Sequence, residues 1–349
     1  MDTLTVRPSQ TKNIVNRAFL AKRPIFMWGA PGIGKSELIE GIVKDMPGNN
    51  LMIDMRLALM EPTDLRGYPF RNAETNQMEW APPADLPSME QAELYDMIVL
   101  FLDELNSAPP SVQAAAYQLV LNGRIGQYVM PSNVRIVAAG NRDTDRGVTY
   151  RMPSPLANRF RHINMDINFE DWSVWAVNNK IHQDVVGYLT YSKADLFDFD
   201  PKTSSQSFAT PRSWSFVSEI LNTEGFDTAP DFEQKAEIAG AVGEGMAIKF
   251  CEHRKVASKL PNPEDVLTGK IKKLDVKEKS AQYSFAIGLC YELAALNTAD
   301  DEVAFDKGVD YFFDFIMDNF EPELVIFSAK SVLSDHDIDI KPRKLQGKK

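Results

Sequence analysis

A glycine-rich segment ending in lysine and serine is the first place where this sequence could do chemistry. The residues GAPGIGKS, from Gly29 to Ser36, fit the spacing G-x-x-x-x-G-K-S and follow the apolar run PIFMW. Gly32 and Gly34 can adopt backbone angles closed to other residues, so successive N–H groups can turn inward on a phosphate at the start of a helix. Lys35 would then reach the β- and γ-phosphates of a nucleotide, and the Ser36 hydroxyl would bind Mg²⁺. The alternative is a glycine-rich turn with a chance lysine.

The residues expected to hold the nucleotide are Gly29, Ala30, Pro31, Gly32, Ile33, Gly34, Lys35, Ser36 and Glu37.

Two adjacent carboxylates, Asp103 and Glu104, end the apolar run IVLFLDE. In a parallel sheet, ligands bind at the carboxyl ends of the strands, so we expect both side chains near the phosphates. Asp103 would hold Mg²⁺, and Glu104 would orient the attacking water. A base beside a metal ligand predicts hydrolysis, although an acidic pair can also simply cap a turn.

Asn141 ends another apolar run, VRIVAAGN. If this run is a strand of the same sheet, the amide reaches the same edge and can position the lytic water beside Glu104. Asparagine is also a common turn former after a strand, and that structural role remains open.

Apolar runs bounded by turn residues predict the strands that must position these groups. They are continuous in hydrophobicity, as a parallel sheet covered on both faces requires, and helical patterns lie between them at 36–46 and 109–123. This alternation predicts an α/β domain over residues 1–168. The proline-rich connection between the second and third runs is too long for a simple crossover, so we expect an insertion at about 56–96. The expected strands are 23–29, 50–55, 97–104, 134–141 and 161–167.

Beyond residue 168 the strand signals fade, and the pattern predicts a helical lid over 169–260 and a helical extension over 261–349 with a basic tail. Cys251 and Cys290 have neighbours typical of helical core positions, and the histidines lack the spacing of metal ligands. No apolar stretch approaches the roughly 20 residues that span a bilayer, and no signal-peptide pattern begins the chain. We therefore expect a soluble, cytoplasmic protein without a membrane segment.

Four segments together resemble the MoxR-type branch of the AAA+ ATPases over about residues 20–165: GAPGIGKS, LFLDELNSAPPSVQAAAYQLV, VAAGNR and SPLANRF. The resemblance implies an AAA+ P-loop NTPase with a five-stranded parallel sheet and an insertion in the second helix. It also implies ATP and Mg²⁺ as cofactors and a homo-oligomeric ring, expected to be a hexamer. The family's Walker A, Walker B and sensor 1 positions fall on the residues already chosen.

Two arginines gain a catalytic role mainly from this resemblance. Arg159, in SPLANRF, matches the arginine finger that such rings insert into the neighbouring subunit's site, where it would stabilise transition-state charge. Arg212 lies in the first turn of a helix predicted to start at Thr210 and Pro211, and a bound anion would offset its conflict with the helix dipole. The resemblance makes Arg212 the sensor 2 residue. The rivals of Arg159 in its arginine-rich segment are Arg142, Arg146, Arg151 and Arg161.

The resemblance implies an ATPase that remodels or activates a protein partner. Residues 242–267 resemble MoxR-like ATPases accompanied by a protein with a von Willebrand factor A (VWA) domain. A nucleic-acid motor or restriction-type NTPase is the main alternative, but a formal net charge of −11 disfavours DNA as a partner. Only the tail Lys341–Lys349 is strongly basic.

A nucleotide switch without mechanical work is the other alternative, which the Asp-Glu pair disfavours. The segment 123–134 is short for a pore-facing hairpin, so the loop that contacts a substrate stays open.

Overall fold

The computed structural model describes residues 4–145, 149–202, 206–299, 301–336 and 338. The chain divides after Asn168 into two compact units, an α/β unit and a helical unit. Arg146 and the basic tail Lys341–Lys349 lie outside the described residues.

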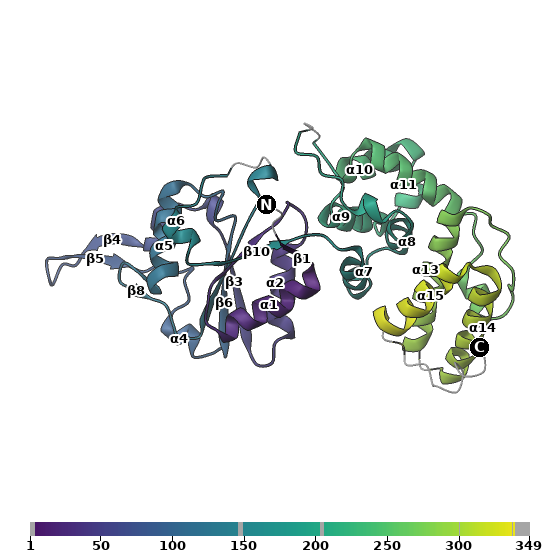
Figure 1. Ribbon diagram of the computed structural model, residues 1–349, viewed down its shortest axis with the longest axis horizontal. Coiled ribbons are helices and arrows are strands. Elements are labelled where there is room, and N and C mark those ends of the chain that lie inside the picture. Colours follow the sequence, from purple (N-terminus) through teal and green to yellow (C-terminus); the bar gives the residue numbers. More distant parts are fainter. Residues whose placement is uncertain (1–3, 146–148, 203–205, 300, 337, 339–349) are drawn as a thin grey trace. The chain divides into compact units, whose positions relative to one another are not determined.

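A parallel sheet of six strands forms the centre of the α/β unit (Figure 1). The apolar runs predict five of these strands, and the prediction misses β1. This strand is only two residues long and carries no apolar run, because it lies at the edge of the sheet and pairs with a single neighbouring strand. In spatial order the strands are β1 (Thr5–Val6), β10 (Arg161–Met165), β2 (Ile25–Trp28), β9 (Val134–Gly140), β6 (Met97–Asp103) and β3 (Asn50–Arg56).

Helices cover both faces of this sheet. Figure 1 shows α1 (Pro8–Leu20) and α2 (Lys35–Asp45) on one side of the strands, and α5 (Pro110–Asn122) and α6 (Ser154–Ala157) on the other. Strand β6 is buried on both faces, as its unbroken apolar run predicts. The expectation of a fully buried strand is wrong for the start of β10, where Arg161 and His162 are exposed, because β1 pairs only with the end of that strand.

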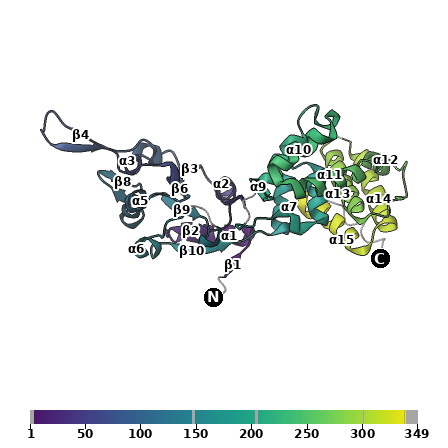
Figure 2. The ribbon, with the colours of Figure 1, turned by 90° about the horizontal axis from the view of Figure 1, so that it is seen from above.

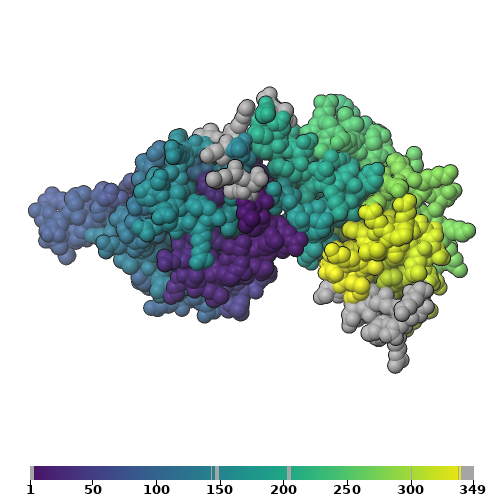
Figure 3. All heavy atoms as spheres, viewed as in Figure 1, coloured from purple at the N-terminus to yellow at the C-terminus, as the bar shows by residue number. Residues whose placement is uncertain are grey.

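The connection between β3 and β6 contains several small elements. The antiparallel strands β4 and β5 form a hairpin that projects from the α/β unit (Figures 1 and 2). Its side chains stand clear of the rest of that unit in the space-filling view (Figure 3), and Tyr68, Phe70 and Met78 are exposed on it. The elements of this connection are η1 (Leu57–Leu59), α3 (Pro62–Arg66), β4 (Tyr68–Arg71), β5 (Met78–Ala81) and α4 (Met89–Ala92). A shorter hairpin, β7 (Arg124–Ile125) and β8 (Tyr128–Val129), follows α5, and η2 (Asp143–Asp145) follows β9.

The described part of the second unit is helical and contains no strand, which confirms the helical prediction. Helix α13 packs against both α8 and α14. The approach of α13 to α8 is close, because a Cβ on Gly187 would lie 2.7 Å from Ser284 Oγ. The elements are α7 (Phe169–Asn178), α8 (Gln183–Tyr191), η3 (Lys193–Leu196), α9 (Pro211–Leu221), η4 (Phe226–Thr228), α10 (Asp231–Val242), α11 (Glu244–Ala257), α12 (Pro263–Leu267), α13 (Lys279–Thr298), α14 (Glu302–Asn319), α15 (Pro322–Lys330) and the π-helical turn η5 (Ser331–Asp335).

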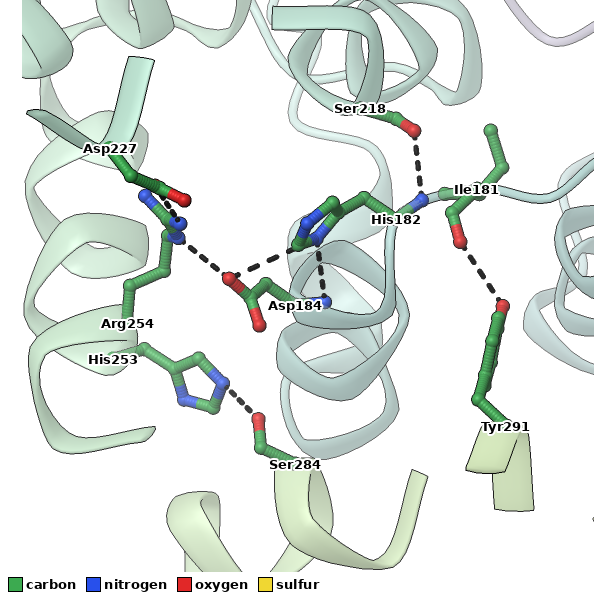
Figure 4. Close-up of polar contacts among 9 residues, drawn as sticks. All are labelled: Ile181, His182, Asp184, Ser218, Asp227, His253, Arg254, Ser284 and Tyr291. Atoms are coloured by element: carbon green, nitrogen blue, oxygen red, sulfur yellow. Dashed lines mark hydrogen bonds and ion pairs between the residues drawn. The ribbon is translucent and has the colours of Figure 1, made fainter. Parts of the chain in front are cut away.

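Polar contacts link the helices of this unit (Figure 4). Arg254 of α11 donates from Nε to Asp184 Oδ2 at 2.7 Å and from Nη2 to Asp227 Oδ1 at 2.9 Å. His253 Nε2 lies 2.7 Å from Ser284 Oγ. The guanidinium therefore connects α8, η4 and α11, while the imidazole connects α11 to α13.

Burial lowers the pKa of His182, His253 and His336 in the helical unit, and it lowers that of His336 to about 4. The unfolded chain has a histidine pKa of about 6.5, so it binds more protons than the folded chain below that pH. We therefore expect the free energy of unfolding to fall as the pH drops from about 6.5 to 5. His336 alone accounts for a loss of about 2 kcal/mol at pH 5. Urea titrations at several pH values measure this loss.

His336→Phe is the control for this prediction. The ring edge packs against Tyr291, and within the described residues Nε2 is buried without a hydrogen-bond partner, so phenylalanine fits the same position. The variant should lose less stability on acidification than the parent chain. Equal losses in both chains would contradict the role given to His336.

Candidate nucleotide site

The glycine-rich loop connects β2 to α2 and has the backbone that a phosphate cradle needs. Gly32 and Gly34 have φ angles of 75° and 84°, in the left-handed region, as the sequence predicts. A Cβ on Gly29 would lie 2.5 Å from Ile33 Cδ1 and 3.2 Å from Met165 O, so a side chain at the start of the loop would require Ile33 to move. Helix α2 begins at Lys35, and its first N–H groups have no partner within the helix. The loop can therefore present backbone donors to an anion.

Lys35 is buried, with 9% of its surface exposed, and connects the loop to the neighbouring strand β9. Its ammonium donates to the carbonyl oxygens of Gly29 at 2.8 Å and Ala30 at 3.0 Å. It also donates to Asn141 Oδ1 at 3.2 Å. The structure thus brings Lys35 and Asn141 together from positions far apart in the sequence.

Oxygen groups expected to bind Mg²⁺ also meet at this edge. The Ser36 hydroxyl donates to Asp103 Oδ2 at 3.3 Å, and Asp103 Oδ1 accepts the Glu104 N–H at 2.9 Å. Glu37 is exposed, and its Oε2 would lie 3.1 Å from a Cβ on Gly34, so its carboxylate lies against the loop. A hydroxyl and a carboxylate are oxygen ligands of the kind that Mg²⁺ prefers.

Glu104 has a φ angle of 55°, an uncommon conformation for a residue other than glycine. The chain turns there, and the next N–H, that of Leu105, donates to Ala139 O of β9 at 3.1 Å. Asn106 then donates from Nδ2 to the backbone oxygen of Asn141 at 2.8 Å. Asn106 is not among the site residues predicted from the sequence. One signal in the sequence could have identified it. Asn106 is a polar residue two positions after Glu104, where the chain must cross the end of the neighbouring strand.

A further carboxylate, Asp54 on β3, was also missed. Its pKa is raised, first by partial burial and then by the nearby Asp103 carboxylate. Arg56, two residues later, is the register partner of Asp103. Two carboxylates therefore lie near each other at this end of β3 and β6, where Arg56 offsets part of their charge and a divalent cation would offset more.

The candidate arginine fingers differ in their contacts. Arg142 donates from Nη2 to Met165 O at 2.7 Å, so its guanidinium is bound within its own unit. Arg151, Arg159 and Arg161 are exposed. Within the part of the chain that the structure describes, the Arg159 side chain has neither an ion pair nor a hydrogen bond. Arg159 lies two residues after the end of α6, and its side chain is exposed.

An imidazole links the start of the loop to α6. Trp28, the residue before Gly29, donates from Nε1 to His162 Nδ1 at 2.9 Å. The other ring nitrogen of His162 lies 2.8 Å from Ala157 O, and because Nδ1 accepts, Nε2 must be the donor. The two rings also stack, with 5.9 Å between their centroids. The helix before Arg159 is therefore tied to the strand before the loop.

Arg212 lies in the helical unit. Helix α9 begins at Pro211, and the Thr210 side chain caps it by accepting the Ser213 N–H at 3.1 Å, as the sequence predicts. Arg212 is exposed in the first turn. Its role as sensor 2 stays a prediction.

Known proteins match the segment that carries this site. Residues 24–160 match the family described as "AAA domain (dynein-related subfamily)". The α/β unit has the AAA+ P-loop NTPase fold. The fold class expected from the sequence is therefore confirmed, with a sheet of six strands in place of five.

Two curated relatives match part of this chain. The uncharacterized protein YeaC of Bacillus subtilis is 25% identical over 146 residues, which are 41% of this chain and 42% of YeaC. Midasin of Giardia intestinalis is 26% identical over 192 residues, 52% of this chain and 4% of midasin. The chain thus covers less than half of each relative.

Solved structures resemble the chain at lower identity. NtrX from Brucella abortus is 15% identical with a TM-score of 0.42, and the match covers 89% of this chain and 69% of NtrX. A RuvB mutant from Thermotoga maritima is 17% identical with a TM-score of 0.38, covering 72% of this chain and 75% of RuvB.

Neither a membrane span nor a metal cluster of acidic, histidine and cysteine side chains occurs in the described ranges. No helix there is long and apolar enough to cross a bilayer. Among the residues that the structure describes, no group of three or more such side chains could hold a metal ion. Cys251 and Cys290 are both buried in helices and unpaired, as expected.

Proposed function

We propose that this chain binds ATP with Mg²⁺ and hydrolyses it, and that it works as a hexameric ring that remodels or activates a protein partner. The observation that carries the proposal is the convergence of Lys35, Ser36, Asp103 and Asn141 at one edge of the sheet. These residues come from the loop, α2, β6 and the end of β9.

The residues present fit both ligands. The left-handed glycines and the buried ammonium of Lys35 suit the phosphates, and Ser36 with Asp103 would hold Mg²⁺. Bound Mg²⁺ supplies positive charge to the β- and γ-phosphate oxygens. Glu104 would accept a proton from the attacking water, and the Asn141 amide would orient that water.

The protein partner is inferred from charge and surface chemistry. A net charge of −11 disfavours a polyphosphate track, and the β4–β5 hairpin exposes Tyr68, Phe70 and Met78 to a partner. The resemblance to the MoxR-type branch supports remodelling or activation, and that of residues 242–267 supports a VWA-domain protein as the partner.

Replacing Lys35 by alanine tests nucleotide binding. We expect the Kd for ATP to rise about 10- to 100-fold, because a charge-assisted hydrogen bond to a phosphate contributes about 1.5–3 kcal/mol. Isothermal titration calorimetry with Mg²⁺ and ATP measures the change. Lys44→Ala is the matched control, since Lys44 lies on the same helix but pairs with Glu40 on the surface. Equal affinities for the two variants would contradict the proposed site.

The partner can be sought with the ring held in its ATP-bound form. Glu104→Gln bound to ATP should capture the partner from a lysate of the native host, and Lys35→Ala should not. Mass spectrometry identifies proteins that only the first variant retains. Recovery of the same proteins by both variants would count against ATP-dependent remodelling.

A further inference from the structure

Asn106 is a buried amide at the junction of two site segments. It is 1% exposed, its Nδ2 donates to Asn141 O at 2.8 Å, and its own backbone oxygen accepts the Tyr150 N–H at 2.7 Å. Its Oδ1 would lie 2.1 Å from a Cβ on Gly140. The amide therefore lies directly against the backbone of the residue before Asn141, where only glycine leaves room for it.

Three consecutive residues join the end of β6 to the end of β9. Glu104 turns the chain with its left-handed φ, Leu105 donates its N–H to Ala139 O at 3.1 Å, and Asn106 donates to Asn141 O. Asn141 in turn accepts from Lys35 Nζ through its side chain. Removing the Asn106 amide would free the Asn141 peptide while leaving Glu104 in its place.

We propose that Asn106 is a positioning residue for ATP hydrolysis: its amide fixes the Asn141 peptide, and thereby the Asn141 side chain, relative to Glu104. The inference rests on the proposed ATPase function. A displacement of about 1 Å in a reacting geometry can cost on the order of 100-fold in rate, so a small movement of Asn141 is enough to matter.

Gln113 provides a matched control for the loss of a buried amide. It is also 1% exposed, and its Nε2 donates to a backbone oxygen, that of Ala108, at 3.0 Å. Its Oε1, like Asn106 Oδ1, is buried without a hydrogen-bond partner among the described residues. Gln113 lies on α5 and bonds to residues before its own helix, so its hydrogen bonds do not hold Asn141.

The experiment compares Asn106→Ala with Gln113→Ala in the full chain. We expect Asn106→Ala to lower kcat about 10- to 100-fold with the ATP Kd changed less than about threefold, and Gln113→Ala to keep kcat within about twofold. Thermal unfolding of both variants accounts for any loss of folded protein. A double-mutant cycle with Asn141→Ala should show that the two asparagine substitutions together cost no more than the larger one alone.

Asn106→Asp keeps the side-chain shape and gives a second readout if the alanine variant folds poorly. A buried carboxyl group has a raised pKa, and in its protonated form it can donate to Asn141 O as the amide does. Relative to the parent, its kcat should therefore fall as the pH rises from 6 to 9. A merely structural role predicts no such pH profile.

The inference is overturned if Asn106→Ala and Gln113→Ala have the same kcat, if the asparagine losses multiply in the double variant, or if the aspartate variant shows a flat relative pH profile. A parent chain that does not hydrolyse ATP would instead overturn the proposed function, and this inference with it. Turnover by the parent is measured first and separates the two failures.

Discussion

Glu104→Gln should keep ATP bound and lower the rate of hydrolysis by about 10²- to 10⁴-fold, the usual contribution of a general base. The amide is nearly the same size as the carboxylate, but it cannot accept the proton of the attacking water. The Lys35–Asn141 and Ser36–Asp103 hydrogen bonds do not involve the Glu104 side chain, so binding should be preserved. Phosphate release measures turnover, and calorimetry measures the ATP Kd.

Glu93→Gln is the control, because Glu93 is an exposed acid that follows α4. It should hydrolyse ATP at the parent rate. Hydrolysis at that same rate by Glu104→Gln would show that Glu104 is not the base.

Arg159→Ala should bind ATP with parent affinity and lose activity by about 10³-fold or more, the effect of an arginine finger on rate. Mixing it with Lys35→Ala subunits should restore part of the activity. In such mixtures a subunit with an intact Lys35 can receive Arg159 from a neighbour. The specific activity of the parent should also rise with protein concentration, because the site is complete only in an oligomer.

Arg151→Ala and Arg161→Ala are the controls for this experiment. Both side chains are exposed in the same region, so each is a rival candidate for the arginine finger. Each should keep most of the parent activity. Mixed rings that form but recover no activity at any ratio would falsify donation of Arg159 between subunits.

The sequence predicts those parts of the fold that leave a local signature. Strand β6 is recognisable because a strand buried on both faces needs an unbroken apolar run, and the loop before α2 because its glycines require left-handed angles. Strand β1 leaves no such signature. Its two residues are held by hydrogen bonds to β10, which lies far away in the sequence.

The same distinction applies to the candidate site. Asp103 and Asn141 are recognisable because each ends or directly follows an apolar run at the same sheet edge. Asn106 and Asp54 are not, because their surroundings arise only when β6 lies between β9 and β3. Nor can spacing separate Arg159 from Arg142, since the difference is a hydrogen bond to Met165 O formed in the folded chain.

The hydrogen bonds of Lys35 have a consequence for the thermodynamics of nucleotide capture. The ammonium holds the carbonyls of Gly29 and Ala30 on one side and Asn141 on the other, so the loop is ordered by the chain's own contacts. The conformational entropy of ordering this loop is lost during folding, not when ATP arrives. We therefore expect binding to proceed without a large refolding of the loop, with an association rate that depends little on loop motion.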